Sequence, residues 1–411
     1  MNHSHTTLQL FKRFLRFGCM AWGGPVAQIA LIKRELVEEE QWVSHTQFNR
    51  ALAVFQALPG PEAHELCVYM GAVVGGFWGG FVAGLGFMLP GLILMLGAIS
   101  LYVQFGLNSN FVLVFTAVQA AVIALISMAV YKIGKHALIN RQLLFLAFLS
   151  MVLTFFDINI YLNLLAIGLL YTVQQTGKPI HVVCIVFALS SLVALKLWPD
   201  RQISKQNTPF ATPKKLEYIS DSIAPQKPIQ NPNNQQLATI FLTGLKGGLL
   251  TFGGAYTAIP FIKNDAVNTR QWLSEQQFLD GVAIANILPA PLVIFATFIG
   301  YFGGAWWGAL IITLGMFLPS FAFTLLGFNA IERLIQYKPL HTFLDGVTAA
   351  VVGIIALTTL QLAYTTLANP WQIMLCMAAI FALYYIKSKF TPLGIVVFAA
   401  LFGYCRLVWE M

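Results

Sequence analysis

Charged residues are scarce in this 411-residue chain. Asp, Glu, Lys and Arg together make up 10% of it, whereas hydrophobic residues make up 58%. A soluble domain needs about a quarter of its residues charged to cover its surface, so the sequence excludes a soluble protein and predicts one embedded in the lipid bilayer. The 24 Lys and Arg outnumber the 16 Asp and Glu, but they lie between hydrophobic runs, as in cytoplasmic loops, and do not indicate a nucleic-acid partner.

Cysteine is rare as well, and motifs for catalysis are absent. The five cysteines are odd in number, lie mostly inside apolar runs and form no C-x-x-C pair, so the sequence predicts neither a disulfide framework nor a metal site. His64-Glu65 begins the metalloprotease pattern H-E-x-x-H, but its fifth position is Val68. We therefore expect no enzyme activity and no cofactor.

The chain does contain a long internal repeat. The stretch from Trp22 to Pro61 recurs without a gap from Phe252 to Pro291, displaced by 230 positions, and more than a third of the aligned residues are identical. Each copy has a Gly-Gly pair near its start and a Pro-x-Pro motif at its end. The chain is a tandem duplication.

The predicted fold is an all-α polytopic membrane protein with two transport repeats of about six spans each. We expect the first repeat at 1–179, a connecting transmembrane helix at 180–198, a flexible polar linker at 199–236 and the second repeat at 237–411. The linker is rich in Pro, Asn, Gln, Ser and Lys. Six spans and one connecting helix make seven crossings, so the second repeat enters the membrane from the opposite face. The whole chain then has about 12–13 spans. Such inverted-topology repeats are common among secondary transporters.

The distribution of basic residues predicts a cytoplasmic N-terminus. With the N-terminus inside, most Lys and Arg of the short loops fall on the cytoplasmic side, as the positive-inside rule requires. In this arrangement the hydrophobic run from about Leu8 to Ile32 crosses the membrane. The loop beginning at Lys33 then lies outside, and its repeat beginning at Lys263 lies inside.

The repeated motifs interrupt hydrophobic runs and thereby predict broken helices. Proline cannot donate to the helix ladder, and a helix that restarts at membrane depth presents free N–H groups and the positive end of its dipole, which favour an anion. Two pairs of breaks related by inversion would bring four half-helix ends toward the membrane midplane. The alternative is that Gly-Gly serves only close helix packing.

Two cations recur at matched positions. Arg16 and Lys246 each lie seven residues before a Gly-Gly pair, and a cation at the centre of a span costs about 2.5–3.5 kcal/mol on insertion scales. A bound oxyanion would offset that cost, although Arg16 could also be an interfacial anchor. The candidate substrate-binding residues are Arg16, Gly23, Gly24, Gln56, Pro59, Gly60, Pro61, Lys246, Gly253, Gly254, Asn286, Pro289 and Pro291.

These motifs resemble those of the chromate ion transporter family, in its long, two-domain form. The resemblance rests on F/W-G-G in each half, the Lys and Trp downstream, Q-A-L-P-G-P with its counterpart N-I-L-P-A-P, and the run G-F-W-G-G…F-M-L-P-G at 76–91. It implies a multi-pass protein of the bacterial inner membrane that exports chromate and confers chromate resistance, with sulfate as the close analogue. Gly60 is matched by Ala290 and Gln56 by Asn286, so the two half-sites need not bind equally.

Several alternatives stay open at the sequence level. Uptake or exchange of sulfate or another tetrahedral oxyanion, and a passive anion channel, are compatible with broken helices. Proton coupling, anion exchange and the membrane potential are each compatible as the driving force. The sequence is also compatible with a homodimer.

Overall fold

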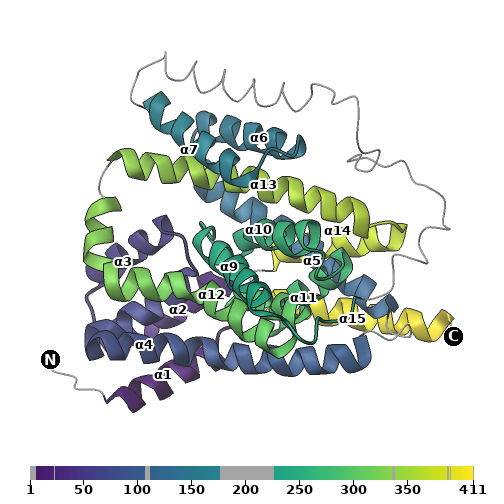
Figure 1. The fold of residues 1–411 in the computed structure, drawn as a ribbon, viewed down its shortest axis with the longest axis horizontal. Helices are drawn as coiled ribbons and strands as arrows, with labels where there is room; N and C mark the ends of the chain where they lie inside the picture. Colours follow the sequence, from purple (N-terminus) through teal and green to yellow (C-terminus); the bar gives the residue numbers. More distant parts are fainter. Residues whose placement is uncertain are drawn as a thin grey trace.

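The computed structural model describes residues 6–22, 24–106, 112–175, 226–335, 338–386, 388 and 390–410 (Figure 1). These residues form helices and short loops, with no strand among them, as expected for an all-helical membrane protein. Among these described residues, five apolar helical segments are long enough to cross a bilayer, namely Glu62–Gln104, Leu113–Ala137, Leu292–Gly327, Pro339–Thr366 and Thr391–Trp409. The predicted connecting helix and the linker up to residue 225 lie outside the described residues.

The duplication seen in the sequence is matched element by element. The first repeat contains α1 (Thr7–Cys19), α2 (Gly24–Ile32), η1 (Lys33–Glu39), α3 (His45–Ala57), α4 (Glu62–Leu101), η2 (Tyr102–Gly106), α5 (Val112–Ala137), α6 (Arg141–Phe155) and α7 (Ile160–Gln175). The second contains α9 (Asn234–Leu249), η5 (Ala255–Thr257), α10 (Ala258–Lys263), η6 (Asn264–Thr269), α11 (Glu275–Ile287), η7 (Leu292–Ile294), α12 (Phe295–Ile335), α13 (Lys338–Thr366), α14 (Pro370–Tyr385) and α15 (Thr391–Glu410). Helices α3 and α11 begin identically, because the Ser44 and Ser274 side chains each accept a hydrogen bond from a backbone N–H in the first helical turn.

The half-helices fold back on each other instead of continuing in line. Arg13 of α1 contacts Glu35 of η1 at 3.0 Å, and Lys246 of α9 contacts Asp265 of η6 at 3.3 Å. In a continuous helix these partners would be about 30 Å apart. The run from Leu8 to Ile32 is therefore a hairpin of two short helices that lie side by side, and not one straight helix. The backbone can reverse here because Gly24 and Gly254 have φ of +77° and +135°.

The Pro-x-Pro breaks form hairpins of the same kind. The Gln47 amide of α3 donates to the Tyr69 hydroxyl of α4 at 3.1 Å, and Phe278 of α11 packs edge-on against Phe295 of α12. The fold thus contains four hairpin tips, which we number tip 1 (residues 20–24), tip 2 (58–61), tip 3 (250–254) and tip 4 (288–291). Tips 1 and 3 are the Gly-Gly breaks, and tips 2 and 4 are the Pro-x-Pro breaks.

Helices α4 and α12 each contain a second sharp turn. Non-helical backbone at Gly75-Gly76 and at Gly304-Ala305 reverses the chain, so that the first arm of α4 (62–74) lies against its second arm (77–101). The two arms touch through glycine, since a Cβ on Gly71 would lie 2.5 Å from the carbonyl oxygen of Gly79. The same close approach joins Gly300 and Gly308 in α12, as in small-residue helix interfaces of membranes.

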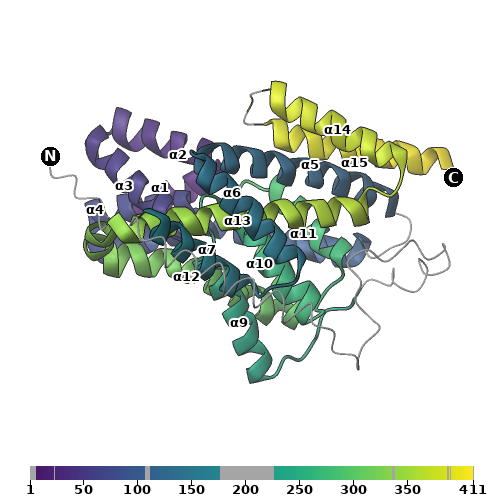
Figure 2. The same cartoon turned by 90° about the horizontal axis from the view of Figure 1, so that it is seen from above.

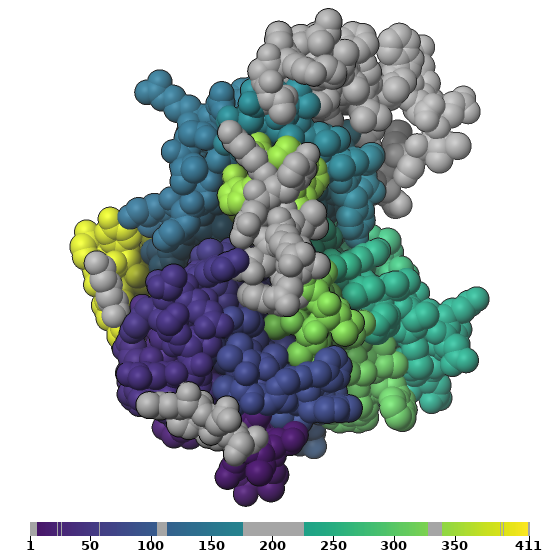
Figure 3. Space-filling model, turned by 90° about the vertical axis from the view of Figure 1, so that its left-hand side faces the viewer, coloured from purple at the N-terminus to yellow at the C-terminus, as the bar shows by residue number. Residues whose placement is uncertain are grey.

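The two repeats exchange helices and form one body. Helix α13 of the second repeat packs against α6 and α7 of the first, whereas α5 of the first packs against α14 and α15 of the second (Figures 1 and 2). Glycine permits these contacts too, because Gly353 touches the backbone of Ala147. Seen from one end, segments of both repeats build the surface (Figure 3).

The second arms of α4 and α12 lie side by side and run in opposite directions. Gly80 packs against Leu325, and Gly84, one turn further along α4, packs against Phe321, one turn earlier in α12. Helices α1 and α15 lie toward opposite sides of the molecule (Figure 1).

Candidate functional site

The four hairpin tips meet at one cavity of about 660 Å³. Tip 1 contributes Gly24, tip 3 contributes Gly253 and Gly254, and tip 4 contributes Ala290, while Gln56 and Glu62 flank tip 2. The remaining wall comes mainly from the C-terminal half of α5, the start of α13, the end of α14 and the start of α15, with the residues Leu125, Met128, Ala129, Lys132, Ile133, His136, Ala137, His341, Leu344, Asp345, Thr348, Leu383, Pro392 and Leu393. Both repeats therefore build the same site.

Helices begin at all four tips. Helix α2 starts at Gly24, α4 at Glu62, η5 at Ala255 and η7 at Leu292, and each of these residues lines the cavity. The first N–H groups of a helix have no partner inside the helix, and they carry the positive end of its dipole. The cavity wall thus contains four such helix starts, an arrangement that suits an anion.

Hydrogen bonds join the tips of one repeat to the tips of the other. The backbone N–H of Gly60 in tip 2 donates to the carbonyl of Thr251 in tip 3 at 2.8 Å. Gln28 of α2 joins the other pair, because its amide donates to the carbonyls of Ala21 in tip 1, at 2.9 Å, and Ala290 in tip 4, at 3.3 Å. A movement of one tip is therefore transmitted to the opposite repeat.

The polar side chains at the tips differ between the repeats. Asn286 accepts a hydrogen bond from the Tyr256 hydroxyl at 2.7 Å, and its amide nitrogen donates to the Val282 carbonyl at 2.9 Å. Its counterpart Gln56 is exposed and forms no side-chain hydrogen bond with the described residues. Hydrogen bonds thus fix the Asn286 side chain, whereas no such bond to a described residue fixes Gln56.

Charged residues cluster on one wall of the cavity. Lys132 is exposed, and its ammonium has no ion-pair partner among the described residues, whereas His341 pairs with Asp345 at 3.1 Å. His136 is exposed one turn after Lys132 and contacts its carbonyl at 2.8 Å. Glu62, directly after tip 2, adds a carboxyl group to the cavity lining.

The structure brings some of the predicted residues together and places others elsewhere. Gly24, Gln56, Gly253, Gly254 and Asn286 line the cavity. The members of the two Pro-x-Pro motifs that were predicted to bind substrate shape tips 2 and 4 without lining the cavity: Pro59, Gly60, Pro61, Pro289 and Pro291. Gly23 lies outside the described residues.

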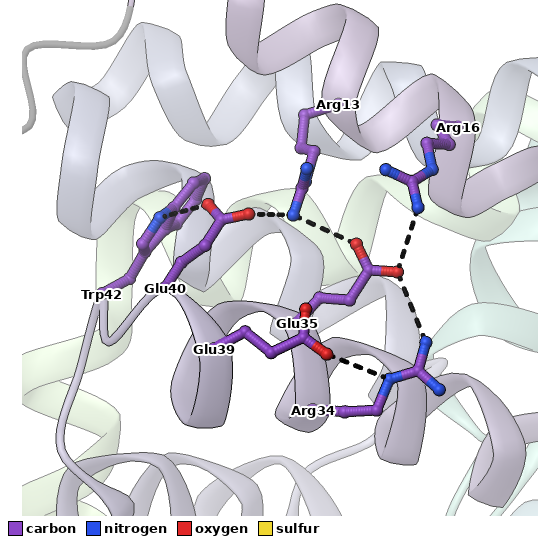
Figure 4. A network of polar contacts seen from close by, with 7 residues as sticks. All are labelled: Arg13, Arg16, Arg34, Glu35, Glu39, Glu40 and Trp42. Atoms are coloured by element: carbon purple, nitrogen blue, oxygen red, sulfur yellow. Dashed lines mark hydrogen bonds and ion pairs between the residues drawn. The ribbon is translucent and has the colours of Figure 1, made fainter.

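Arg16 and Lys246 occupy matched positions but do not line the cavity. Arg16 lies 3.4 Å from the buried carboxylate of Glu35, in a network that includes Arg13, Arg34 and Glu40 (Figure 4). Lys246 lies 3.3 Å from Asp265, which occupies the position of Glu35 in the second repeat, and 5.5 Å from the ring centre of Tyr161. Each cation thus ties the two arms of its hairpin together.

Sequence reasoning missed Lys132, His136, His341 and Tyr256. Glu62 was not among the predicted binding residues either; it occupies the first turn of α4 and lines the cavity. Lys132 and His341 lie on helices α5 and α13, outside the repeated motif, and their counterparts in the other repeat are not basic. Lys132 and His136 lie one helical turn apart on α5, and this spacing was the signal available in the sequence.

Comparison with known proteins agrees with the repeat structure. A family profile described as "Chromate transporter" matches residues 8–173 and 238–404. The chain is 44% identical to a chromate transport protein of Pseudomonas aeruginosa over 96% of this chain and 91% of that protein. It is 31% identical to a chromate transport protein of Cupriavidus metallidurans over 97% and 93%, and 24% identical to an uncharacterized transporter of Methanocaldococcus jannaschii over 98% and 95%. No solved structure is significantly similar.

Proposed function

Because this chain belongs to the chromate transporter family, we propose that it is a secondary transporter that exports chromate from the cytoplasm across the inner membrane. The observation that carries the proposal is the convergence of both repeats on one cavity with four helix starts in its wall. The cavity volume of about 660 Å³ has room for an oxyanion with part of its hydration shell.

The residues that bind the oxyanion in this proposal lie mainly at the hairpin tips. The backbone N–H groups near Gly24 and Gly254 face a tetrahedral oxyanion, Asn286 and Gln56 supply amide donors, and Lys132 attracts the anion to the cavity. The prolines and Gly60 keep the tips open by preventing continuous helix. Arg16 and Lys246 act indirectly, by holding the hairpins in shape.

We further propose that the repeats are inverted across the membrane. The antiparallel packing of the second arms of α4 and α12 supports this arrangement, as do the exposed aromatic pairs Phe77-Trp78 and Trp306-Trp307 that follow their turns. Because Gly84 lies beside Phe321, the positions of the two aromatic pairs along the packed arms follow from the residue numbers. They are about 20 residues apart, or about 30 Å. That is the thickness of the hydrocarbon core, and aromatic residues favour its two interfaces.

The cavity position fits loading from the cytoplasm. Its charged wall belongs to the end of α5, beside Lys135 and Arg141, which are basic residues of the kind that stay inside. An exporter collects its substrate on that side. A dianion leaving the cell is also favoured by an inside-negative potential, by about 2.3 kcal/mol per charge per 100 mV.

The test is tracer flux in sealed vesicles made from cells with and without the full-length chain. We expect inverted vesicles that contain the protein to accumulate chromate above the outside concentration when energised, and sulfate to compete. Accumulation no greater than the membrane potential alone produces, and lost when the potential is collapsed, would identify a channel instead. Accumulation of sulfate that chromate does not inhibit would contradict chromate as the substrate.

A further inference from the structure

One carboxyl group at tip 2 has no role in the transport site described above. The Glu65 side chain is fully buried, and neither of its oxygens has a hydrogen-bond partner among the described residues. It lies against the backbone of tip 2, since a Cβ on Gly60 would be 2.4 Å from the Glu65 Oε1. An ionised carboxylate without partners is expensive to bury. Glu65 is therefore a group that holds a proton in this conformation.

Glu62 connects this group to the cavity. It lies three residues before Glu65 on α4, one helical turn away on the same face, and it lines the cavity while being 8% exposed. Glu62 thus lies between the cavity and the buried carboxyl group.

No cation of the described residues forms an ion pair with either carboxyl group, although Lys132, His136, His341 and Asp345 line the same cavity as Glu62. Glu62 is the charged group that acts on Glu65 through space. His64, on the same arm of α4, is turned into a cluster of Phe87, Phe317 and Phe321 from α4 and α12. None of the ion pairs between described residues, on α1, α9 or any other element, includes Glu62 or Glu65.

The arrangement exists in one repeat only. At the corresponding positions after tip 4, the second repeat has Leu292, Val293, Ile294 and Phe295, all buried and apolar. The hairpin fold itself is the same in both repeats and does not require carboxyl groups there. The pair in the first repeat therefore serves something other than folding.

We propose that Glu62 and Glu65 form a proton-binding site that is linked to the oxyanion site. Negative charge on the pair repels a dianion in the cavity, so the protonated pair is the form that accepts the anion. Because binding linkage is reciprocal, the anion in turn favours protonation, and at a pH where the anion-free pair is ionised the pair takes up a proton as the anion binds. This inference rests on the proposed function, because it requires an oxyanion in the cavity.

The experiment measures proton uptake directly. The purified full-length protein is placed in weakly buffered solution with a pH indicator at alkaline pH, where chromate stays a dianion, and sodium chromate or sodium sulfate is added. We expect the wild-type protein to make the solution more alkaline as it binds either anion. Its affinity should rise as the pH falls, by up to about tenfold per pH unit for one linked proton.

Two variants and a matched control identify the group. Glu65→Gln and Glu62→Gln keep the side-chain shape and remove the titration, so each should bind the anion with reduced proton uptake and a weaker dependence on pH. Glu38→Gln removes an exposed carboxyl group of η1 and should behave as wild type. Elution of each variant as a single species in gel filtration verifies folding, and two independent variants guard against a folding failure in one.

The outcomes separate this inference from the proposed function. Binding without proton uptake by the wild type, or wild-type uptake in both Gln variants, would overturn the proton site while leaving the transporter intact. Absence of chromate and sulfate binding by the folded wild-type protein would instead contradict the proposed function.

Discussion

At the residue scale, Lys132 is the cation best placed to attract the substrate. It lines the cavity and has no ion-pair partner among the described residues, so its charge is not compensated locally. We expect Lys132→Ala to weaken chromate binding by about 1–2 kcal/mol, or roughly five- to thirty-fold in KM, and Lys132→Arg to retain most of the affinity. Lys135→Ala, which removes an exposed cation of the same helix that does not line the cavity, is the control. Equal effects of the two Ala variants on vesicle flux would argue against a specific role.

Gly60 is the residue of tip 2 that tolerates no side chain. Its φ is +156°, and an added Cβ would collide with the Glu65 carboxyl group. We expect Gly60→Ala to reduce thermal stability by about 1–3 kcal/mol and to impair transport, whereas Gly97→Ala, at a position with free space around it, should do neither. Because Ala290 occupies the equivalent position of tip 4, a neutral outcome at Gly60 would mean that the two tips are interchangeable.

The residues at the tips could be predicted because they recur. Gly24 and Gly254, or Gln56 and Asn286, are recognisable when the two halves are aligned, and the chemistry of a broken helix then points to an anion. Lys132 and His341 could not be found in this way. They reach the cavity from helices that follow the repeated motif, and nothing in the local sequence of a helix says which distant hairpin it will cover.

At the element scale, the ion pair of each re-entrant hairpin is the feature to test. If Lys246 only neutralises Asp265, then Lys246→Ala should lower stability and flux by leaving a nearly buried carboxylate unpaired, at a cost of about 1–3 kcal/mol. The double variant Lys246→Ala/Asp265→Asn should then recover most of both. A double-mutant cycle in flux and thermal stability measures this coupling.

The alternative role of Lys246 gives a different result. Were the ammonium a direct ligand of the oxyanion, removing Asp265 as well would restore stability but not flux. Thr243→Ala, which removes a weaker contact to the same carboxylate at 3.3 Å, serves as the control for disturbing the hairpin.

The sequence predicted where helices break but not what the chain does after the break. A Gly-Gly pair is compatible with a kink that continues across the membrane and with a full reversal, and composition is the same in both cases. Reversal is decided by contacts between the arms, such as Arg13 with Glu35, which become recognisable only when the two arms are placed side by side. The same limit applies to the turn at Gly75-Gly76, where the sequence shows only another pair of glycines.

At the scale of the whole molecule, the duplication explains why the site is central. Each repeat supplies two tips, and each tip is bonded to one of the other repeat, through Gly60 and Thr251 on one side and Gln28 and Ala290 on the other. The exchange of helices, with α13 against α6 and α7 and α5 against α14 and α15, prevents the repeats from separating. Conformational change therefore has to occur within this joined body, by shifting the tips relative to the helices that cover them.

The prediction that is most easily contradicted concerns the orientation of the two repeats in the membrane. If the hairpin of α1 and α2 returns to its starting face, a cytoplasmic N-terminus places the loop after Lys33 inside, and inverted repeats place the loop after Lys263 outside. This reverses the sides that the sequence alone predicted while keeping the loops on opposite faces. Glu38 and Asn268 occupy equivalent, exposed positions in these loops.

Single cysteines at these positions, in a variant without the five native cysteines, report the sides of the membrane. We expect Asn268→Cys to react with an impermeant thiol reagent in intact cells, and Glu38→Cys to react only after permeabilisation. Labelling of both from the same side would contradict inverted repeats. The reverse pattern would keep the inversion but place the N-terminus and the charged wall of the cavity outside, and the cavity would then load from the exterior, as an uptake system requires.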